Sequence, residues 1–346
     1  MRPIQLDELR RDAEVFNDLA RATPHVDGYC TSTAWALSAH EAFHPEQELF
    51  LFRSDTAWLT LARGYSEHIG RYLAPMEAMW GLASPLVGVD PLDSTLQAIA
   101  ALESIDAEWD NLWLCGLDPN APPFMLLARH FSERHAVFLG PPTLRHVASL
   151  EGGFEGWLSR RSARFRANLR RALRKAETAG IQVEWHSDFR DAAHREACVE
   201  RALNIDDASW KGESDQGLRA SEMANFYERM TARLANTGAL RMIFLKLGDE
   251  DIAMGFGARS SDTLRGLQMS YVKRYAPYSP GNVLQAHFIQ RIADEGIHSY
   301  DLGTDIGYKA RWASPGLETA ALVVRRQADL LHAHRLRARH PVRWAR

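Results

Sequence analysis

The alternation of apolar and polar positions predicts both helices and strands in the first half of the chain. Two short apolar runs, ELFLFR and AWLTLARG, are joined by Ser-Asp within 48–64, which is typical of a β-hairpin. The predicted elements of this half are a helix over 5–20, the hairpin over 48–64, a helix over 93–104, a strand over 111–117, a helix over 122–134 and a strand over 135–140. The pair Pro141–Pro142 then breaks the chain.

The second half repeats this outline with stronger signals. Its predicted elements are a helix over 153–180 ending at Gly180, a strand over 181–186, helices over 190–209 and 219–236, a hairpin over 239–260, a strand over 263–272, a helix over 280–296, a strand over 298–305 and a last strand over 318–326. Strands grouped as hairpins with helices between them favour an α+β fold over a doubly wound parallel sheet.

We therefore expect two tandem domains, each a mixed, mostly antiparallel sheet flanked by helices. The predicted domains are 1–145 and 146–328, followed by a basic tail over 329–346. The last predicted strand is expected to close the second sheet. Both halves share a hairpin–strand–helix–strand outline, which suggests a duplication in which the first copy is degenerate.

Composition narrows the class of protein. The 346 residues carry a net charge of −3 and 46% hydrophobic residues, which is ordinary for a globular protein and gives no reason to expect DNA or an anionic membrane as partner. No apolar run is long enough for a transmembrane segment. The three distant cysteines predict a reducing, cytoplasmic location. The 14 histidines are scattered and no Cys–His spacing fits a zinc site, so no metal is expected.

The stretch YSPGNVLQAHFI (278–289) predicts an anion-binding helix start. Proline favours helix entry, glycine leaves the first amides uncovered, and the free N–H groups carry partial positive charge. The residues expected to hold an anion are Ser279, Gly281, Asn282, Val283 and Leu284, with Lys273 and Arg274 just upstream. The alternative is a helix capped by Ser279, in which Pro280 and Gly281 only turn the chain.

A basic helix precedes this region. Arg166, Arg170 and Arg174 recur at spacing four within 160–175, beside Phe165. They form either a solvated face or a surface for an acidic acceptor, a coenzyme phosphate or an RNA backbone.

Five motifs in order resemble the GNAT acyltransferase superfamily, in the branch typified by CelD-like and FemAB-like proteins. They are SARFRANLRRALRKAETAG, SWKGESDQGL, DEDIAMGFGARS, YAPYSPGNVL and YDLGTDIGYKARW, all within about 154–325, and the first 140 residues match more loosely. The resemblance implies acyl-CoA, with acetyl-CoA as the expected donor, held at the helix start. One departure is that the usual glycine-rich loop is reduced to Gly281.

The resemblance also assigns roles to other residues. Trp210, Lys211 and Lys309 would bind the acceptor, alongside Arg166 and Arg170. Asp301 or Asp305 would accept a proton from the nucleophile, and Tyr308, the preferred candidate, would protonate the leaving thiolate. The structural alternatives are that Trp210 covers the edge of the core, that Asp301 caps a turn and that Lys309 pairs with it.

These features predict a GNAT-type N- or O-acyltransferase. Its acceptor would be an amine or hydroxyl of a small molecule, or of a cell-envelope, polysaccharide or peptide precursor. One alternative is a FemAB-like ligase that uses aminoacyl-tRNA; the short helical stretch over 180–239, in place of a long helical arm, disfavours tRNA. Another is a non-catalytic GNAT-fold binding module, suggested by the reduced glycine loop.

Overall fold

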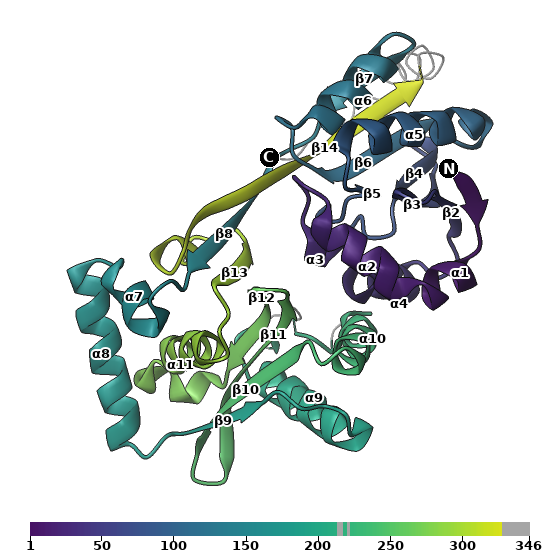
Figure 1. Cartoon of the computed structure of the whole chain (residues 1–346). Coiled ribbons are helices and arrows are strands. Elements are labelled where there is room, and N and C mark those ends of the chain that lie inside the picture. The colour runs from purple at the N-terminus through teal and green to yellow at the C-terminus, as the bar shows by residue number, and fades with distance from the viewer. Residues whose placement is uncertain (213–216, 220–221, 327–346) are drawn as a thin grey trace. The chain divides into compact units, whose positions relative to one another are not determined.

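A computed structural model describes residues 1–212, 217–219 and 222–326 of the chain (Figure 1). It consists of two compact units, which are described separately. Unit 1 comprises Met1–Thr143 and the chain from Leu317 onward, and unit 2 comprises Leu144–Gly316. The predicted tail over 329–346, and part of the SWKGESDQGL motif, lie outside the described residues. None of the described helices combines the length and apolar character needed to cross a bilayer.

Unit 1 has a mixed sheet between two groups of helices. Its elements are β1 (Arg2–Ile4), α1 (Leu6–Arg11), α2 (Ala13–Ala22), α3 (Gly28–Thr31), a π-helical turn (Thr33–Leu37), α4 (Ser38–Phe43), β2 (Glu48–Arg53), β3 (Ala57–Ser66), β4 (Gly70–Pro75), β5 (Leu86–Gly88), α5 (Pro91–Ser104), a 3₁₀ turn (Asp106–Glu108), β6 (Asn111–Leu117), α6 (Pro122–Ser132), β7 (His135–Leu139) and β14 (Ser314–Arg326). The strands follow the order β1-β2-β3-β4-β6-β14-β7, with β5 beside β3.

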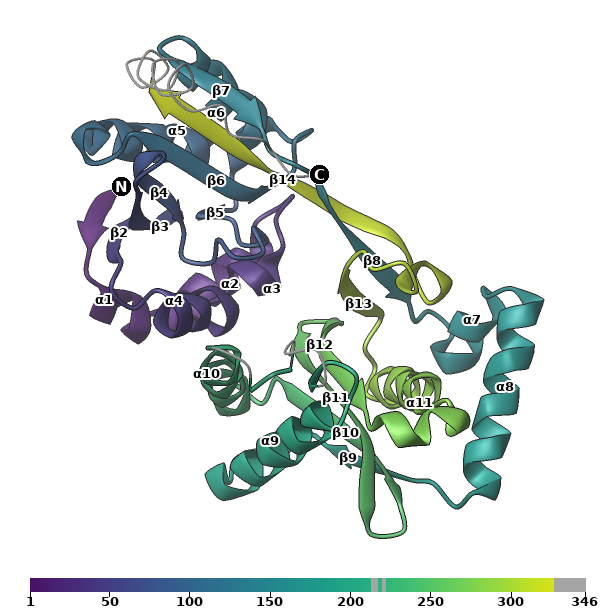
Figure 2. The same ribbon diagram turned by 180° about the vertical axis from the view of Figure 1, so that it is seen from behind.

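Side chains that alternate along β3 separate the two helix layers of unit 1. Trp58 packs edge-on against Phe16 of α2, with ring centroids 5.5 Å apart. Its neighbour Leu59 points the other way, into the cluster formed with α5 and α6. The two layers are visible on opposite sides of the sheet in Figure 2. The period-two pattern of the predicted hairpin thus places one apolar residue in each layer.

Unit 2 begins at Leu144, within β8, and contains the more strongly patterned half of the chain. Its elements are β8 (Thr143–Ser149), α7 (Gly153–Ser159), α8 (Ala163–Thr178), β9 (Gln182–His186), α9 (Ala192–Asp207), α10 (Met223–Asn236), β10 (Leu240–Leu247), β11 (Glu250–Ser260), β12 (Thr263–Tyr271), a 3₁₀ turn (Lys273–Tyr278), α11 (Pro280–Asp294), β13 (Ser299–Thr304) and a 3₁₀ turn (Lys309–Arg311). The strands follow the order β8-β13-β12-β11-β10-β9, and only β12 with β13 is parallel.

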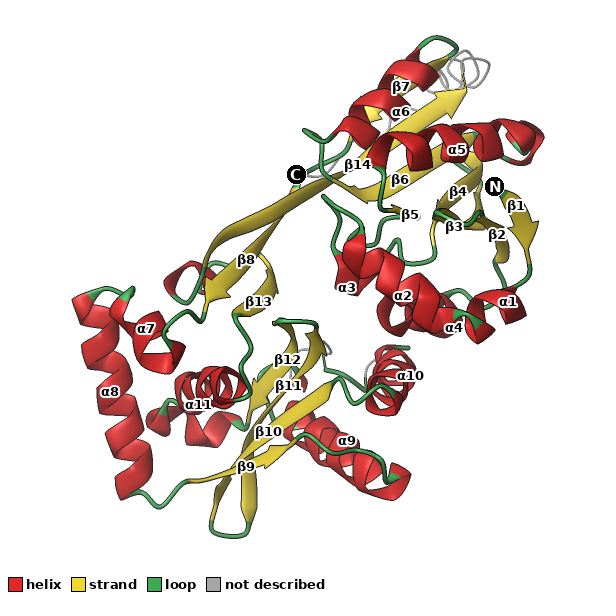
Figure 3. Ribbon diagram, viewed as in Figure 1, coloured by secondary structure: helices red, strands yellow, loops and turns green. Residues whose placement is uncertain are grey.

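Helices cover both faces of this second sheet as well (Figure 3). Phe256 of β11 packs on Tyr227 of α10, whereas its neighbour Gly257 lies under Phe288 of α11. The apolar stripe predicted for α11 is buried: the side chains of Val283, Leu284, Phe288, Ile289 and Ile292 are all at most 3% exposed. The predicted α+β class, with mostly antiparallel sheets flanked by helices, is confirmed.

The two units share one topology. Three antiparallel strands (β2–β4, β10–β12) lead into a helix (α5, α11), which returns the chain to a strand parallel to the third (β6, β13). The last strand differs from the prediction. Within β14, Leu322–Arg325 pair with both β6 and β7, so the strand expected to close the second sheet belongs to unit 1. Sequence pattern identifies a strand but carries no information about its partner, which tertiary packing selects.

Candidate active site

The two parallel strands of unit 2 separate part-way along their length and leave a cleft. The pairing of β12 with β13 ends at Arg265 opposite Asp301. A bulge on the other side of β12 also leaves Leu267 without a partner in the register with β11. The cleft has a volume of about 1360 Å³. Ligand pockets typically measure ~300–1000 Å³, so this one has room for a large donor together with an acceptor.

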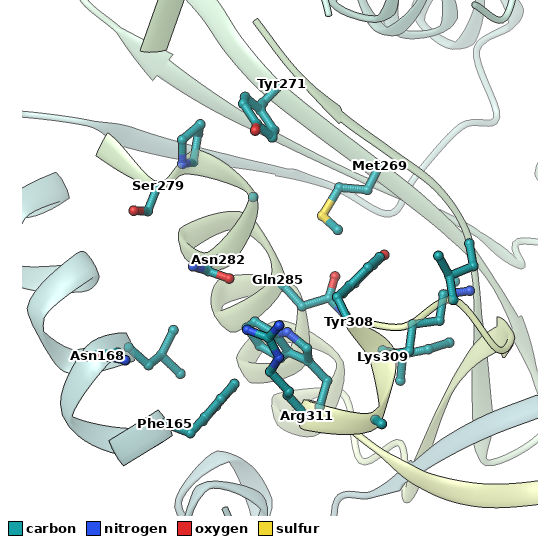
Figure 4. A pocket seen from close by; sticks show the side chains of 18 of the residues that line it. Phe165, Asn168, Met269, Tyr271, Ser279, Asn282, Gln285, Tyr308, Lys309 and Arg311 are labelled. Atoms are coloured by element: carbon teal, nitrogen blue, oxygen red, sulfur yellow. The ribbon is translucent and has the colours of Figure 1, made fainter. Parts of the chain in front are cut away.

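Several segments of unit 2 line the cleft (Figure 4). β12 contributes Gly266–Tyr271, the chain after β13 contributes Tyr308–Trp312, and α8 and the start of α11 form the other walls. Gly266 has a steric reason to be glycine, because a Cβ there would lie 2.8 Å from the hydroxyl of Tyr300. The edges of the cleft are therefore set by strand separation together with close packing at Gly266.

Ionisable side chains in the lining carry one sign of charge. Six lysines and arginines border the cleft, namely Arg160, Arg161, Arg164, Lys211, Lys309 and Arg311. The described lining contains no aspartate, glutamate or histidine. A concave, partly apolar site lined by an excess of positive charge attracts anions, because its walls concentrate the field. The cleft is therefore suited to a polyanionic ligand.

The start of α11 provides fewer free amides than the sequence suggested. Ser279 has left-handed backbone angles (φ 54°, ψ 47°), and its side chain does not cap the helix. Its carbonyl instead accepts hydrogen bonds from the amides of Asn282 and Val283, at 3.0 and 3.2 Å. Leu284 is the first residue whose amide can bond within the helix. The predicted anion contacts from the amides of Asn282, Val283 and Leu284 are thus corrected, and the Gly281 amide is left without a partner among the described residues.

Around this amide, side chains supply further polar atoms. Ser279 and Asn282 border the pocket in Figure 4, as does Tyr271. A Cβ on Gly281 would lie 3.6 Å from the Tyr271 ring, at ordinary contact distance. The helix start therefore presents one amide with an adjacent hydroxyl and carboxamide to the cleft.

Lys211 lies in a polar network along β12. Its Nζ donates to Gln268 Oε1 at 2.7 Å, to the Met269 carbonyl at 3.0 Å and to Ser270 Oγ at 3.1 Å. Asp206, which is fully buried, accepts a hydrogen bond from Ser270 and lies 3.9 Å from the ammonium. Burial lowers the pKa of Lys211, while Asp206 opposes that shift. Lys211 is thus a buried cation at the cleft wall, and its neighbour Trp210 lines the same cleft at 52% exposure.

Tyr308 and Lys309 lie where the chain leaves β13. The Tyr308 side chain points into the pocket toward Met269 (Figure 4), and desolvation raises its pKa, so the phenol stays protonated at neutral pH. The Nζ of Lys309 donates to the carbonyl of Thr304 at 2.8 Å. Burial, together with the charge of Arg265, lowers the pKa of Lys309 to about 8. The pair therefore offers a proton donor and an amine that is partly neutral near pH 7.

The two predicted catalytic aspartates are placed elsewhere. Asp301 forms a largely buried ion pair with Arg265 and accepts a hydrogen bond from the amide of Gly303 at 2.7 Å. Asp305 pairs with His146 Nε2 at 2.9 Å. Neither aspartate lines the cleft. Asp301 instead fixes the point where β13 leaves β12, which is close to the structural alternative of a turn cap.

Four predicted basic contacts also fall outside the cleft lining. Arg166 donates to the carbonyl of Arg161 at 2.5 Å, and Arg170 is solvent-exposed. Arg274 pairs with Glu250 on the surface, and Lys273 is exposed. The arginines at spacing four lie on a face of α8 that does not border the cleft. The helix instead packs its apolar stripe against α11.

Other polar residues line the cleft in place of the predicted arginines. Their positions in the sequence could have indicated this only once the structure was known. Arg164 and Asn168 each directly precede a residue of the apolar side of α8, Phe165 and Leu169, and both border the cleft. Arg161 lies just before the helix and also borders it. Gln285 interrupts the apolar stripe of α11; it is 3% exposed and hydrogen-bonded to the Tyr300 hydroxyl.

Unit 1 has the same topology, but a carboxylate caps the corresponding helix start. The first turn of α5, the counterpart of α11, is capped by Asp90, whose Oδ1 accepts from the amides of Leu92 and Asp93 at 3.0 and 3.1 Å. Nearby, the buried carboxylate of Glu77 accepts from four successive amides over 80–83. A hollow of about 20 Å³ lies beside α5 and α6, enough for little more than a water. The protein's own carboxylates thus occupy the amide groups of unit 1 that could bind an anion.

Comparison with known proteins agrees with this geometry. Residues 163–312 match the family model described as an acetyltransferase (GNAT) domain. No curated protein sequence matches the chain significantly. The predicted resemblance to the GNAT superfamily is thereby confirmed over residues 163–312, and this match supports a transferase.

Solved structures extend the likeness to nearly the whole chain. A conserved protein of unknown function from Bacteroides thetaiotaomicron has a TM-score of 0.61 at 12% identity, covering 91% of this chain and 97% of that one. FemX has a TM-score of 0.63 at 11% identity, covering 92% and 97%. The C-terminal domain of a lysylphosphatidylglycerol synthetase from Agrobacterium fabrum has a TM-score of 0.55 at 12% identity, covering 94% and 95%. At these identities the shared property is the fold alone.

Proposed function

We propose that the protein is an acyltransferase that moves an acyl group, acetyl in the first instance, from coenzyme A to an amine or hydroxyl acceptor. The acceptor class we favour is a small molecule or a cell-envelope, polysaccharide or peptide precursor. The observation that supports this proposal most is the cleft between β12 and β13. It combines one free amide at the start of α11 with six cationic side chains, and its described lining contains no acidic side chain. The three widely spaced cysteines are free thiols, and we keep the cytoplasm as the expected location.

A coenzyme A donor suits this cleft because it carries phosphate groups at one end and an apolar arm leading to the thioester. The Gly281 amide, with Ser279 and Asn282, is the proposed contact for a phosphate. The arginines beside α8 would neutralise further charge, since guanidinium groups bind phosphate in a bidentate way. The exposed edge of β12 offers backbone groups along which an extended arm can lie.

The proposed chemistry is direct attack on the thioester without a covalent enzyme intermediate. The acceptor nitrogen or oxygen forms a bond to the acyl carbon, and the carbon–sulfur bond breaks. Lys309, in its neutral form, accepts the proton of the nucleophile, and Tyr308 protonates the departing thiolate. The predicted roles of Asp301 and Asp305 are not retained, since neither reaches the cleft lining.

The main alternative keeps the cleft but changes the donor to an aminoacyl-tRNA, as the FemAB-like resemblance implies. The cationic lining would suit the sugar-phosphate end of a tRNA as well. The helices between β9 and β10, α9 and α10, have 16 and 14 residues and form no extended arm among the described residues. We therefore favour coenzyme A and treat tRNA as an outcome to be distinguished by experiment.

The decisive experiment removes one amide hydrogen. Gly281→Pro deletes the free N–H and produces a Pro-Pro helix start, which this chain already tolerates at Pro122–Pro123 of α6. Loss of one charge-assisted hydrogen bond costs about 1.5–3 kcal/mol, or roughly 10- to 150-fold in affinity. Coenzyme A should raise the melting temperature of the wild-type protein, and the Gly281→Pro variant should need at least tenfold more coenzyme for the same shift.

Gly281→Ala is the matched control, because it keeps the N–H and adds one methyl at ordinary contact distance from Tyr271. It should bind coenzyme A within a few-fold of wild type. If both variants bind as wild type does, the helix start is not the phosphate site. If coenzyme A has no effect and aminoacyl-tRNA stabilises the protein, the alternative donor is correct; if neither binds, the chain is a non-catalytic module.

A further inference from the structure

Unit 2 contains a cluster of potential metal ligands outside the cleft. His186 lies at the end of β9, and His194 and Cys198 lie one turn apart on α9. One ligand atom from each residue lies within 4.8 Å of the others. None of the three lines the cleft, so the cluster is separate from the proposed acyl-transfer site. We propose that these residues, with Glu184 as fourth ligand, bind a zinc ion that links β9 to α9.

The histidine–cysteine pair on α9 lies close to the spacing that a tetrahedral ion requires. Zn–S and Zn–N bonds of ~2.3 and ~2.0 Å place tetrahedral ligand atoms ~3.3–3.6 Å apart. The Sγ of Cys198 lies 3.9 Å from Nε2 of His194, so a shift of a few tenths of an ångström brings this pair into range. The spacing of four residues on α9 points both side chains to one side of the helix.

An unsatisfied nitrogen supports the assignment independently. The Nε2 of His186 is buried and has no hydrogen-bond partner among the described residues. Buried polar atoms are nearly always paired, so an unpaired one points to a missing partner.

The types of ligand atom in the cluster favour a divalent ion of intermediate softness. A carboxylate oxygen of Glu184 lies 3.7 Å from His186 Nε2, within reach of an ion between them. Arg201 holds Glu184 and Asp251, each at 2.7 Å, and orients the proposed fourth ligand in the way metal-binding carboxylates are usually held. One thiolate with two imidazoles selects zinc or cobalt over magnesium or calcium, which prefer oxygen ligands.

The cluster shows why the sequence predicted no metal. The residues at 186, 194 and 198 come from a strand and a helix separated by a loop, and their spacing matches no zinc motif. Cys198 is 1% exposed, whereas both histidines are only partly buried. An ion would thus enter from the histidine side and displace the thiol proton, and the site would act as a structural cross-link.

The test uses the full-length protein, stripped with chelator and titrated with Co²⁺ and Zn²⁺. The wild-type protein should bind one equivalent of Co²⁺ with a thiolate-to-cobalt charge-transfer band, and Zn²⁺ should raise its melting temperature. Cys198→Ala should lose the band, the bound equivalent and the thermal shift. The matched control, Cys115→Ala, removes another buried free cysteine in unit 1 and should behave as wild type.

His194→Gln provides a second variant in case Cys198→Ala folds poorly, which circular dichroism would reveal. It should retain the fold and weaken Co²⁺ binding at least tenfold. Absence of the charge-transfer band in the wild-type protein would overturn the assignment. Equal metal binding by wild type and Cys198→Ala would also overturn it, because the ion would then lie elsewhere on the chain. Coenzyme A binding is measured separately and does not depend on either outcome.

Discussion

The interaction between Lys211 and Asp206 gives the sharpest quantitative prediction. Asp206 is fully buried, and the ammonium of Lys211 lies 3.9 Å from its carboxylate. At an effective dielectric constant of ~20, two unit charges at this separation attract by about 4 kcal/mol. Removing one partner of a buried pair typically costs ~3–5 kcal/mol, because the other charge stays buried and uncompensated. Lys211→Met should therefore lower the free energy of unfolding of unit 2 by an amount in this range.

A double-mutant cycle isolates the pairwise term. Asp206→Asn removes the negative charge and keeps a polar group for Ser270 and the amide of Leu218. If the charges attract as calculated, Lys211→Met should cost much less in the Asp206→Asn background, with a coupling energy of about 2–4 kcal/mol.

The assay must report on unit 2, since the chain has two compact units and a single global transition is not assured. Hydrogen exchange of peptides from β10–β12, measured across a urea series, gives that local stability. The exposed Arg274–Glu250 pair is the matched control, and Arg274→Met with Glu250→Gln should show no measurable coupling. A Lys211–Asp206 coupling below about 0.5 kcal/mol would refute the reasoning, because independent sites add to within that margin.

Three further predictions concern the cleft. Tyr308→Phe should lower kcat by a factor of roughly 10²–10⁴ if the phenol is the acid. Its free energy of unfolding in urea should stay within about 0.5 kcal/mol of the wild-type value, because Tyr308 is 42% exposed. An unchanged kcat would exclude that role. Because Lys309 in the folded protein is protonated below its pKa of about 8, the rate should rise with pH toward that value and level off above it. If a Lys309→Gln variant keeps the same pH profile, Lys309 is not the base. Gly266→Ala should destabilise unit 2 by about 1–3 kcal/mol, because the new methyl would lie 2.8 Å from the Tyr300 hydroxyl. In urea titrations, adding Tyr300→Phe should recover part of that loss of stability.

Much of the fold was predictable because periodic patterns depend on local backbone geometry. The hairpin over 48–64 and the strand over 111–117 appear as β2–β3 and β6, and α11 buries the stripe predicted for it. Less of the site was predictable, because the direction in which a side chain points and the partner with which it pairs depend on contacts between distant parts of the chain. Tyr308, Lys211 and Gly281 do line one cleft, as the motifs suggested. Asp301 and Asp305 do not, since Arg265 and His146 hold them away from it.

The sequence alone predicted the α+β class and the start of a helix at Pro280, because both follow from residue periodicity and the conformational limits of proline and glycine. Tertiary structure decided which groups meet. It placed β14 in unit 1, turned a different row of arginines toward the cleft, and brought His186 beside His194 and Cys198. Such encounters depend on how strands and helices pack across long stretches of chain, where residue spacing carries no information about distance.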